Sequence, residues 1–109
     1  MSQQNWKFAD SFAWIYNYSE QIIGAGFLIG SKDIATCTHV VREALGLQST
    51  PADAPNDAIS LSFPFLTQDK LSATVFAKGW DIKKDIALLH INGELPEGVQ
   101  SAMMSSGKI

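Results

Sequence analysis

The sequence predicts an all-β protein, specifically a six-stranded antiparallel β-barrel. Six short segments carry the residue types and the alternation that are typical of strands. Glycines interrupt one of the apolar runs and predict strong bends, which suit a small closed barrel better than a flat sheet. Only one segment has helical spacing, so the strand–helix rhythm of a parallel sheet is missing. We expect strands near residues 12–18, 21–29, 33–38, 58–63, 71–78 and 86–91.

The first strand is predicted from aromatic residues at every second position, namely Phe12, Trp14, Tyr16 and Tyr18. Side chains two residues apart in a strand point to the same face, so we expect this face to be buried and Trp14 to lie in the core. The second strand falls in the apolar run 22–30, which contains three glycines. Glycine inside a strand indicates a bend or a close approach of the backbone to a neighbouring element.

The third strand begins after a turn at residues 30–33, and we expect it to end at His39. The segment VVREALGL, residues 40–47, then has apolar residues at helical spacing and predicts one or two helical turns. Gly46 is the expected stop of this helix, because glycine adopts the left-handed conformation that ends many helices. The polar segment 48–57 contains two prolines and predicts a surface loop.

The barrel domain is expected to span residues 1–91. Pro64 has no backbone N–H to donate and therefore marks the end of the fourth strand as an edge or a corner. Residues 92–109 show little strand or helix periodicity, and we interpret them as a linker or tail.

Composition excludes several classes of function. The net charge is −3 and the pI is near 5.1, so no basic surface is expected for nucleic acid. The single Cys37 cannot form an internal disulfide. The N-terminal residues lack the pattern of a signal peptide, and the longest apolar run has nine residues, well short of the roughly 20 that a membrane helix needs. We therefore expect a cytoplasmic protein with no nucleic-acid or membrane partner.

Two polar residues border segments that otherwise have core character. His39 follows the third predicted strand, and Asp85 directly precedes the last one. In a catalytic triad, a carboxylate holds an imidazole in one tautomer so that its other nitrogen accepts a proton from a nucleophile. Each residue stands at the end of a strand, where the backbone is rigid. Together they form a candidate catalytic pair.

The sequence around both residues resembles the trypsin/chymotrypsin-like serine proteases. The run ATCTHVV, residues 35–41, is similar to the histidine motif of that family, and DIALLHI, residues 85–91, is similar to its aspartate motif. The two motifs occur in the family's order and at close to its usual separation. The run GAGFLIGSKD, which leads into the histidine motif, is also similar to the preceding family strands. The resemblance covers about residues 12–91.

This resemblance implies the first of two six-stranded barrels, with His39 as general base and Asp85 as its orienting carboxylate. Asp81 is the competing aspartate, but the family residue directly precedes the Ile-Ala-Leu-Leu run, so we interpret Asp81 as a turn residue. Residues 92–109 would then be the linker toward a second barrel. The substrate class implied is peptide or protein, and no cofactor is implied.

The sequence departs from the family at the nucleophile. The family's Gly-Asp-Ser-Gly-Gly run does not occur among the 109 residues, and the only late serine–glycine stretch is Ser105-Ser106-Gly107. This stretch lies 20 residues after Asp85, too close to belong to a second barrel. The oxyanion-hole amides come from the same missing loop in this family. We therefore expect no peptidase activity from this chain alone.

Cys37 offers an alternative nucleophile, because cysteine and histidine form a known nucleophile–base pair. If Cys37 and His39 were two apart on one strand, however, the sulfur would lie beside the ring rather than in line with Nε2. We therefore interpret Cys37 as a small packing residue. Cys37, His39 and His90 show no metal-ligand spacing, so no metal site is predicted.

Three interpretations remain at the level of sequence. The first is the N-terminal half of a trypsin-like serine endopeptidase, whose partner is its own C-terminal half or a second copy in a homodimer. The second is a protease-derived barrel that acts as a protein interaction module. The third is an unrelated small β-barrel, in which both motifs arose by coincidence.

Overall fold

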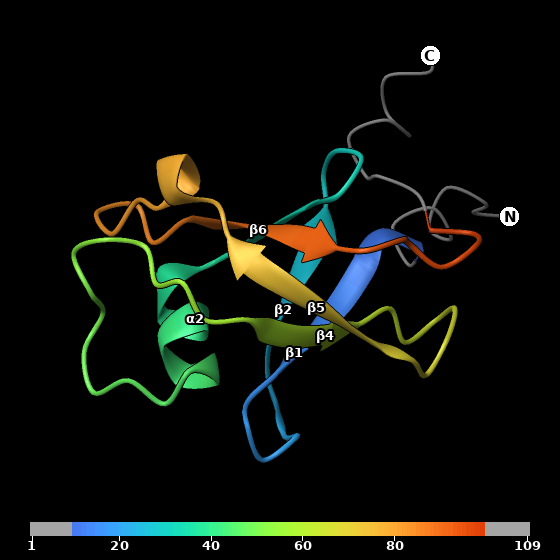
Figure 1. Cartoon of the computed structure of the whole chain (residues 1–109), viewed down its shortest axis with the longest axis horizontal. Coiled ribbons are helices and arrows are strands. Elements are labelled where there is room, and N and C mark those ends of the chain that lie inside the picture. Colours follow the sequence, from blue (N-terminus) through green and yellow to red (C-terminus); the bar gives the residue numbers. More distant parts are fainter. Residues whose placement is uncertain (1–9, 100–109) are drawn as a thin grey trace, which may run out of the picture.

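The computed structural model describes residues 10–99, which form a closed antiparallel barrel with one short α-helix (Figure 1). The elements are β1 (Phe12–Tyr16), β2 (Ile22–Leu28), β3 (Asp33–Thr36), α2 (Thr38–Ala44), β4 (Ile59–Ser62), β5 (Lys70–Val75), η1 (Ala77–Gly79) and β6 (Ala87–Asn92). The strands follow the order β1-β2-β3-β6-β5-β4, and pairing of β1 with β4 closes the sheet. The predicted fold class is confirmed.

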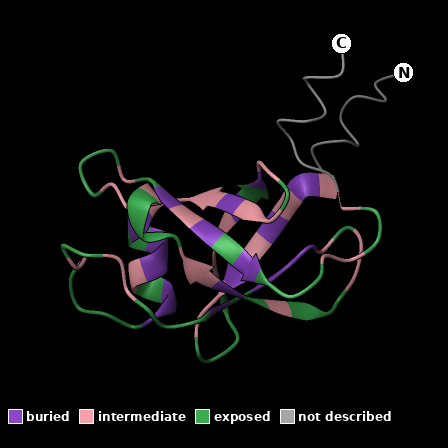
Figure 2. Cartoon of the chain, turned by 45° about the horizontal axis from the view of Figure 1, so that its top comes forward, coloured by how far each residue is buried: buried purple, intermediate pink, exposed green. Residues whose placement is uncertain are grey.

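The core consists mainly of small and aliphatic side chains, and Phe63 is the fully buried aromatic residue among residues 10–99. Along the strands, buried residues alternate with residues that are partly or fully exposed, as Figure 2 shows. In β1 the fully buried residues are Ala13 and Ile15, whereas Trp14 is only partly buried. The prediction that the aromatic face of β1 forms the core was therefore wrong. A six-stranded barrel is narrow, and its interior has room for alanine and isoleucine but not for a row of aromatic rings.

The aromatic residues of β1 instead form a cluster on the outside of the barrel. Phe12 lies edge-on to Trp14, with ring centroids 4.8 Å apart, and to Phe27 of β2, at 5.5 Å. Phe65 adds a tilted contact with Phe12 at 5.9 Å. Edge-to-face contacts of this kind stabilise by roughly 0.5–1.5 kcal/mol each beyond the burial of area. Phe65 remains 64% exposed and Phe27 42% exposed, so water still reaches the cluster.

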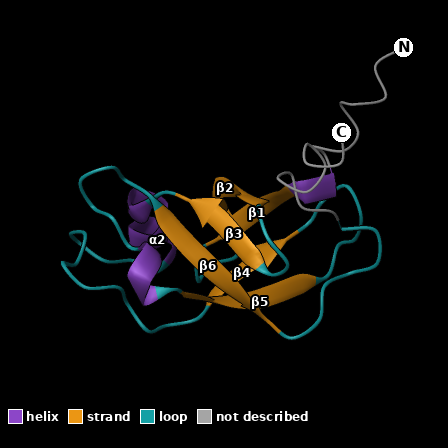
Figure 3. Ribbon diagram, turned by 90° about the horizontal axis from the view of Figure 1, so that it is seen from above, coloured by secondary structure: helices purple, strands orange, loops and turns teal. Residues whose placement is uncertain are grey.

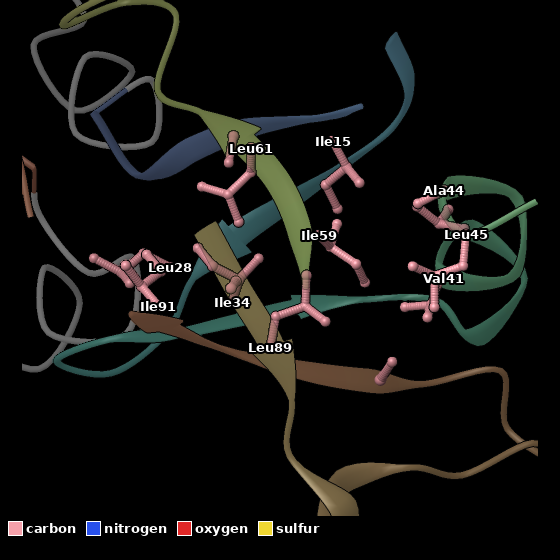
Figure 4. Packing of buried hydrophobic residues seen from close by; sticks show 14 of the residues in the cluster. Ile15, Leu28, Ile34, Val41, Ala44, Leu45, Ile59, Leu61, Leu89 and Ile91 are labelled. Carbon is pink, nitrogen blue, oxygen red and sulfur yellow. The ribbon is translucent and has the colours of Figure 1, made fainter. Parts of the chain in front are cut away.

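The helix α2 closes one end of the barrel (Figure 3). Its residues Val41 and Ala44, with Leu45 just beyond, are buried and turn toward Ile15 and Ile59 of the barrel wall, as the close view in Figure 4 shows. Complete burial of an aliphatic side chain such as Val41 contributes about 1.5–3 kcal/mol. The helix is therefore held by its apolar face, which fixes the direction of its exposed face as well.

The third strand ends earlier than predicted, and this changes the setting of His39. The last β3–β6 pair is Thr36 with Ala87, after which Cys37 is the extended residue that precedes α2. The carbonyl of Cys37 accepts hydrogen bonds from the N–H groups of Val40 and Val41, which starts the helix. His39 therefore belongs to the first turn of α2 and does not end a strand.

The helix ends where the sequence indicated. Gly46 has φ of +69°, and its N–H bonds to the carbonyl of Glu43, while the N–H of Leu47 bonds to Arg42. Left-handed glycine after the last turn satisfies carbonyl groups that would otherwise lack partners. The following loop, residues 48–57, has no regular structure, as predicted.

Other strands also end at residues that differ from the predicted ones. β1 ends at Tyr16 instead of residue 18, because the side chain of Asn17 accepts hydrogen bonds from the backbone of Ser19 and Gln21 and forms a turn. β5 ends at Val75 and passes into the single turn of η1. Trp80 follows η1, and its indole N–H donates to the carbonyl of Pro51 at 3.0 Å. Trp80 thus fastens the long loop to the barrel.

The predicted tail begins near the observed end of β6. Residues 93–99 contain turns but no strand, and Leu95 and Val99 pack against the core. Residues 100–109, including Ser105 and Ser106, lie outside the described residues, as does the N-terminal segment 1–9. Within residues 10–99, no helix is long and apolar enough to span a membrane.

Candidate active site

His39 owes its position to the close packing of α2 on β2. Gly24 of β2 lies against Val40, the residue after His39, and a Cβ atom at position 24 would come within 2.7 Å of the Val40 side chain. Only glycine allows this approach without a shift of the helix. The expectation that a glycine in the second strand marks a close approach is confirmed here. The residue on the exposed side of the same helical turn is His39.

Asp85 is positioned by a tight loop between η1 and β6. A two-way backbone bridge joins Asp81 and Ile86, at 2.9 and 3.0 Å, and closes the loop. Asp81 accepts a hydrogen bond from the N–H of Lys84 through its side chain, so it is a turn residue, as predicted. Asp85 itself has φ of +56°, in the left-handed region. Aspartate tolerates the left-handed conformation better than most residues. This conformation directs the Asp85 carboxylate toward α2.

The structure brings His39 and Asp85 into direct contact. Nδ1 of His39 lies 2.6 Å from Oδ2 of Asp85, which is a hydrogen-bonding distance. The other carboxylate oxygen, Oδ1, accepts a hydrogen bond from the hydroxyl of Thr38 at 2.7 Å and another from the backbone N–H of His39 at 3.0 Å. Three hydrogen bonds therefore hold one carboxylate, and all come from two adjacent residues of α2.

The same hydrogen bonds favour the ionised form of Asp85. The hydroxyl of Thr38, followed by the backbone N–H and the ring of His39, lowers the pKa of Asp85 from 3.8 to about 2. Asp85 is therefore ionised at neutral pH and has no proton to give. Nδ1 of His39 must then be the donor to Oδ2, so Nε2 is the ring nitrogen that takes no part in this hydrogen bond. His39 is 52% exposed, so an external group has access to the ring.

Thr38 is a site residue that the sequence did not reveal. Its hydroxyl donates to Asp85, and only 2% of the residue is exposed. The signal was a hydroxyl residue immediately before the histidine. A hydroxyl at position 38 is informative only if a helix starts at that residue, whereas the sequence predicted a strand that ends at His39.

Cys37 also differs from its predicted setting. It precedes the helix rather than sharing a strand face with His39, so the argument from strand alternation does not apply. Its Sγ, a ring nitrogen of His39 and a carboxylate oxygen of Asp85 all lie within 4.8 Å of one another. Partial burial, and then the nearby charge of Asp85, raise the pKa of the Cys37 thiol. A thiol with a raised pKa is protonated at neutral pH and is a poor nucleophile.

His90 lies apart from this group. It pairs across the strands with Asp33 of β3, and its Nδ1 lies 3.2 Å from Oδ1 of that residue. A hollow of about 340 Å³ is also separate, since it is lined by the β1–β2 turn, β4 and Lys70 and includes neither His39 nor Asp85. The candidate site among residues 10–99 is thus the group formed by the start of α2 and Asp85.

Comparison of the sequence with known protein families and with curated proteins finds no match. The chain is a six-stranded antiparallel β-barrel with one short helix, and no family identifies it further.

Proposed function

We propose that this chain is the N-terminal barrel of a trypsin-like serine endopeptidase, in which His39 is the general base and Asp85 orients it. The observation that carries the proposal is the carboxylate of Asp85, which is fixed by Thr38 and by the backbone of His39 and accepts the Nδ1 proton at 2.6 Å. The motif resemblance and the six-stranded barrel support the same proposal.

In this mechanism Nε2 of His39 takes the proton of a serine hydroxyl while the serine oxygen attacks the carbonyl carbon of a peptide bond. Asp85 remains ionised and stabilises the imidazolium that forms, and the imidazolium then gives its proton to the departing amine. The negative charge on Asp85 is already in place before the reaction, so the pair needs little rearrangement at that moment.

The nucleophile and the oxyanion-hole donors would come from a second barrel outside these 109 residues. We therefore expect the 109-residue chain alone not to hydrolyse peptides and not to react with a fluorophosphonate probe for active serines. Labelling of this chain that disappeared in Ser105→Ala or Ser106→Ala would contradict that expectation.

The test of the proposal uses the parent protein, obtained by extending the reading frame beyond residue 109. We expect a Gly-Asp-Ser-Gly-like run in the added sequence, and fluorophosphonate labelling that His39→Ala abolishes. His90→Ala is the matched control, because it removes the other histidine, and it should leave labelling intact. A reading frame that adds no such run, or labelling that survives His39→Ala, would refute the proposal.

A second function, as a protein interaction module, is favoured by one observation. The outer aromatic cluster leaves Phe65 64% exposed and Phe27 42% exposed on the same side of the barrel as Phe12. Exposed aromatic clusters are typical of interaction surfaces. A homodimer would be the simplest assembly.

Sedimentation at several concentrations tests this second function. If the cluster joins two copies, Phe65→Ser weakens association, whereas Phe76→Ser, which changes an exposed phenylalanine outside the cluster, does not. A monomer at all concentrations, or equal effects of both variants, would exclude self-association through this surface.

A further inference from the structure

Three potential metal-ligating side chains meet at the start of α2. One donor atom from each of Cys37, His39 and Asp85 lies within 4.8 Å of the other two. The histidine and aspartate side chains are 52% and 44% exposed, so a hydrated ion can reach them. Cys37 is only partly buried, and it is the one cysteine of the sequence. The proposed hydrolytic function uses the histidine and the aspartate and leaves the sulfur without a role.

The carboxylate is arranged so that one of its oxygens is available to an ion. Oδ1 of Asp85 is occupied by the hydroxyl of Thr38 and the backbone N–H of His39, which hold the group in place. Oδ2 has a single described partner, the ring Nδ1 of His39 at 2.6 Å. The proton between Nδ1 and Oδ2 is therefore the only group that an entering ion needs to displace from the pair.

We propose that Cys37, His39 and Asp85 bind a thiophilic divalent ion of the Zn²⁺ class, which takes the place of the proton shared by His39 and Asp85. Thiolate, imidazole and carboxylate are the three ligand types that zinc uses in proteins, at about 2.0–2.3 Å. In a tetrahedral site such donors are roughly 3.3–3.8 Å apart, which a side-chain rotation of Cys37 and a slight opening of the His39–Asp85 contact provide. Mg²⁺ and Ca²⁺ prefer sets of oxygen ligands and are excluded.

The binding step balances with the release of one proton. The ion forms bonds to Nδ1, Oδ2 and Sγ, the ring proton moves from Nδ1 to Nε2 through solvent so that the imidazole stays neutral, and the thiol proton leaves from Cys37. A bound ion stabilises the thiolate that the protein alone disfavours, since coordination deprotonates a thiol. A water molecule completes the fourth position.

The consequence for activity rests on the proposed function, whereas the binding does not. An ion at Nδ1 removes the hydrogen bond that orients the ring and leaves the ring proton on Nε2, so Nε2 has no lone pair with which to accept a proton from a nucleophile. The zinc-loaded site is therefore an inhibited form of the general base. A labile ion of this kind would keep the parent protein inactive until a chelator or a competing protein removed it.

The second histidine–aspartate pair of the molecule provides a built-in control. His90 and Asp33 are 55% and 46% exposed, close to the values for His39 and Asp85. This pair has no sulfur beside it, because the sequence has no second cysteine. Any ion binding that needs only an exposed histidine and aspartate would occur at both places.

The test is a titration of the reduced 109-residue chain with Co²⁺ as a spectroscopic substitute, followed by displacement with Zn²⁺. We expect one equivalent to bind and to give a thiolate-to-cobalt charge-transfer absorption in the near ultraviolet. Cys37→Ser should abolish this absorption and weaken Zn²⁺ binding by at least roughly 10- to 100-fold, and His39→Ala should weaken it similarly. His90→Ala should change neither.

Circular dichroism of each ion-free variant establishes that the barrel is folded, and Cys37→Ser, which is nearly isosteric, is the variant least at risk. Failure to bind Zn²⁺, or binding that is unchanged in Cys37→Ser, would overturn the proposal. Such a result leaves the protease proposal standing, because fluorophosphonate labelling of the parent protein is measured with chelator present. Conversely, a parent protein without a nucleophile would leave the ion site intact and remove only its inhibitory role.

Discussion

The molecule contains two histidine–aspartate pairs that are nearly equal in exposure and very different in construction. His39 and Asp85 lie 2.6 Å apart and His90 and Asp33 lie 3.2 Å apart, with side chains that are about half exposed in both pairs. In the first pair the aspartate comes from a left-handed loop residue and the histidine from a helix. In the second pair both residues come from adjacent strands.

The difference lies in what holds the carboxylate. Asp85 accepts hydrogen bonds from the hydroxyl of Thr38 and from the backbone of His39 as well as from the ring. Within residues 10–99, the side chain of Asp33 makes one hydrogen bond to another side chain, that of His90. A cross-strand pair of this kind arises readily from the register of two strands and contributes little. Juxtaposition alone is thus weak evidence of function, and the anchoring of the acid distinguishes the two pairs.

The largest effect is expected on catalytic activity, which should respond very differently to substitution of Asp85 and of Asp33. In the parent protein of the proposed function, Asp85→Asn should reduce kcat by about 10⁴-fold, because the amide no longer holds His39 in the tautomer that frees Nε2. Asparagine accepts the left-handed conformation, so the loop is preserved. Asp33→Asn should leave kcat within about twofold, since that pair makes no contact with the site. Steady-state peptide hydrolysis measures kcat for both variants. Equal losses of kcat would show that the two histidine–aspartate pairs do not differ in function.

The next effect concerns the anchor itself. Thr38→Val removes the hydroxyl that contributes most to the low pKa of Asp85, so that pKa should rise. The chain should lose about 1 kcal/mol of stability, the usual net contribution of a hydrogen bond. Carbon-13 NMR titration of the carboxylates and urea unfolding measure the two changes.

Thr36→Val is the matched control for this variant. The hydroxyl of Thr36 donates to the carbonyl of Ala25 at 2.8 Å and does not touch Asp85. Its removal should cost a similar amount of stability without moving the pKa of Asp85. A pKa of Asp85 that is unchanged in Thr38→Val would show that the hydroxyl is not the anchor.

A pH dependence of stability follows from the lowered pKa of Asp85. Its pKa is about 2 in the folded chain against 3.8 for the free group. A lowered pKa stabilises the fold above about pH 4, and the stabilisation is lost as the pH falls toward 2. The difference in Tm between the wild-type chain and Asp85→Asn should therefore shrink over this range. Calorimetry at several pH values measures it, and a constant difference would contradict the assignment.

The smallest effect is expected at the second pair. His90→Gln should change the free energy of unfolding by less than about 0.5 kcal/mol, because an exposed pair is screened by water and held by one contact. Urea unfolding at neutral pH tests this. A loss of more than about 1 kcal/mol in the free energy of unfolding would mean that the cross-strand pair is also anchored. The two histidine–aspartate pairs would then differ less than their contacts indicate.

The sequence predicted the six-stranded barrel, and it failed where a face or a backbone angle had to be chosen. Alternation in β1 identified the strand but could not say which of its two faces is inside. Aromatic residues suggested one face, yet Ala13 and Ile15 fill the narrow interior and Trp14 faces outward. The choice depends on the width of the closed barrel, which is a property of all six strands together.

For the site, too, the sequence indicated which residues meet but not their backbone conformations. His39 and Asp85 were named from their motifs, and their contact is confirmed by the distance between them. Their backbone settings were not foreseen, because β3 stops at Thr36 and Asp85 adopts a positive φ. Pairing of β3 with β6 determines where β3 ends, and closure of the loop by Asp81 and Ile86 determines the backbone conformation of Asp85. Both are tertiary effects that local residue preferences do not contain.

The pairing of β1 with β4 has a consequence for how this chain meets other chains. A sheet that closes on itself offers no free strand edge within residues 10–99, so another polypeptide cannot extend it by backbone hydrogen bonding. Within these residues, amyloid-like growth from the folded state has no edge strand as a template. A partner that binds residues 10–99 must therefore rely mainly on their side chains and loops, where single substitutions can change binding without disturbing the barrel.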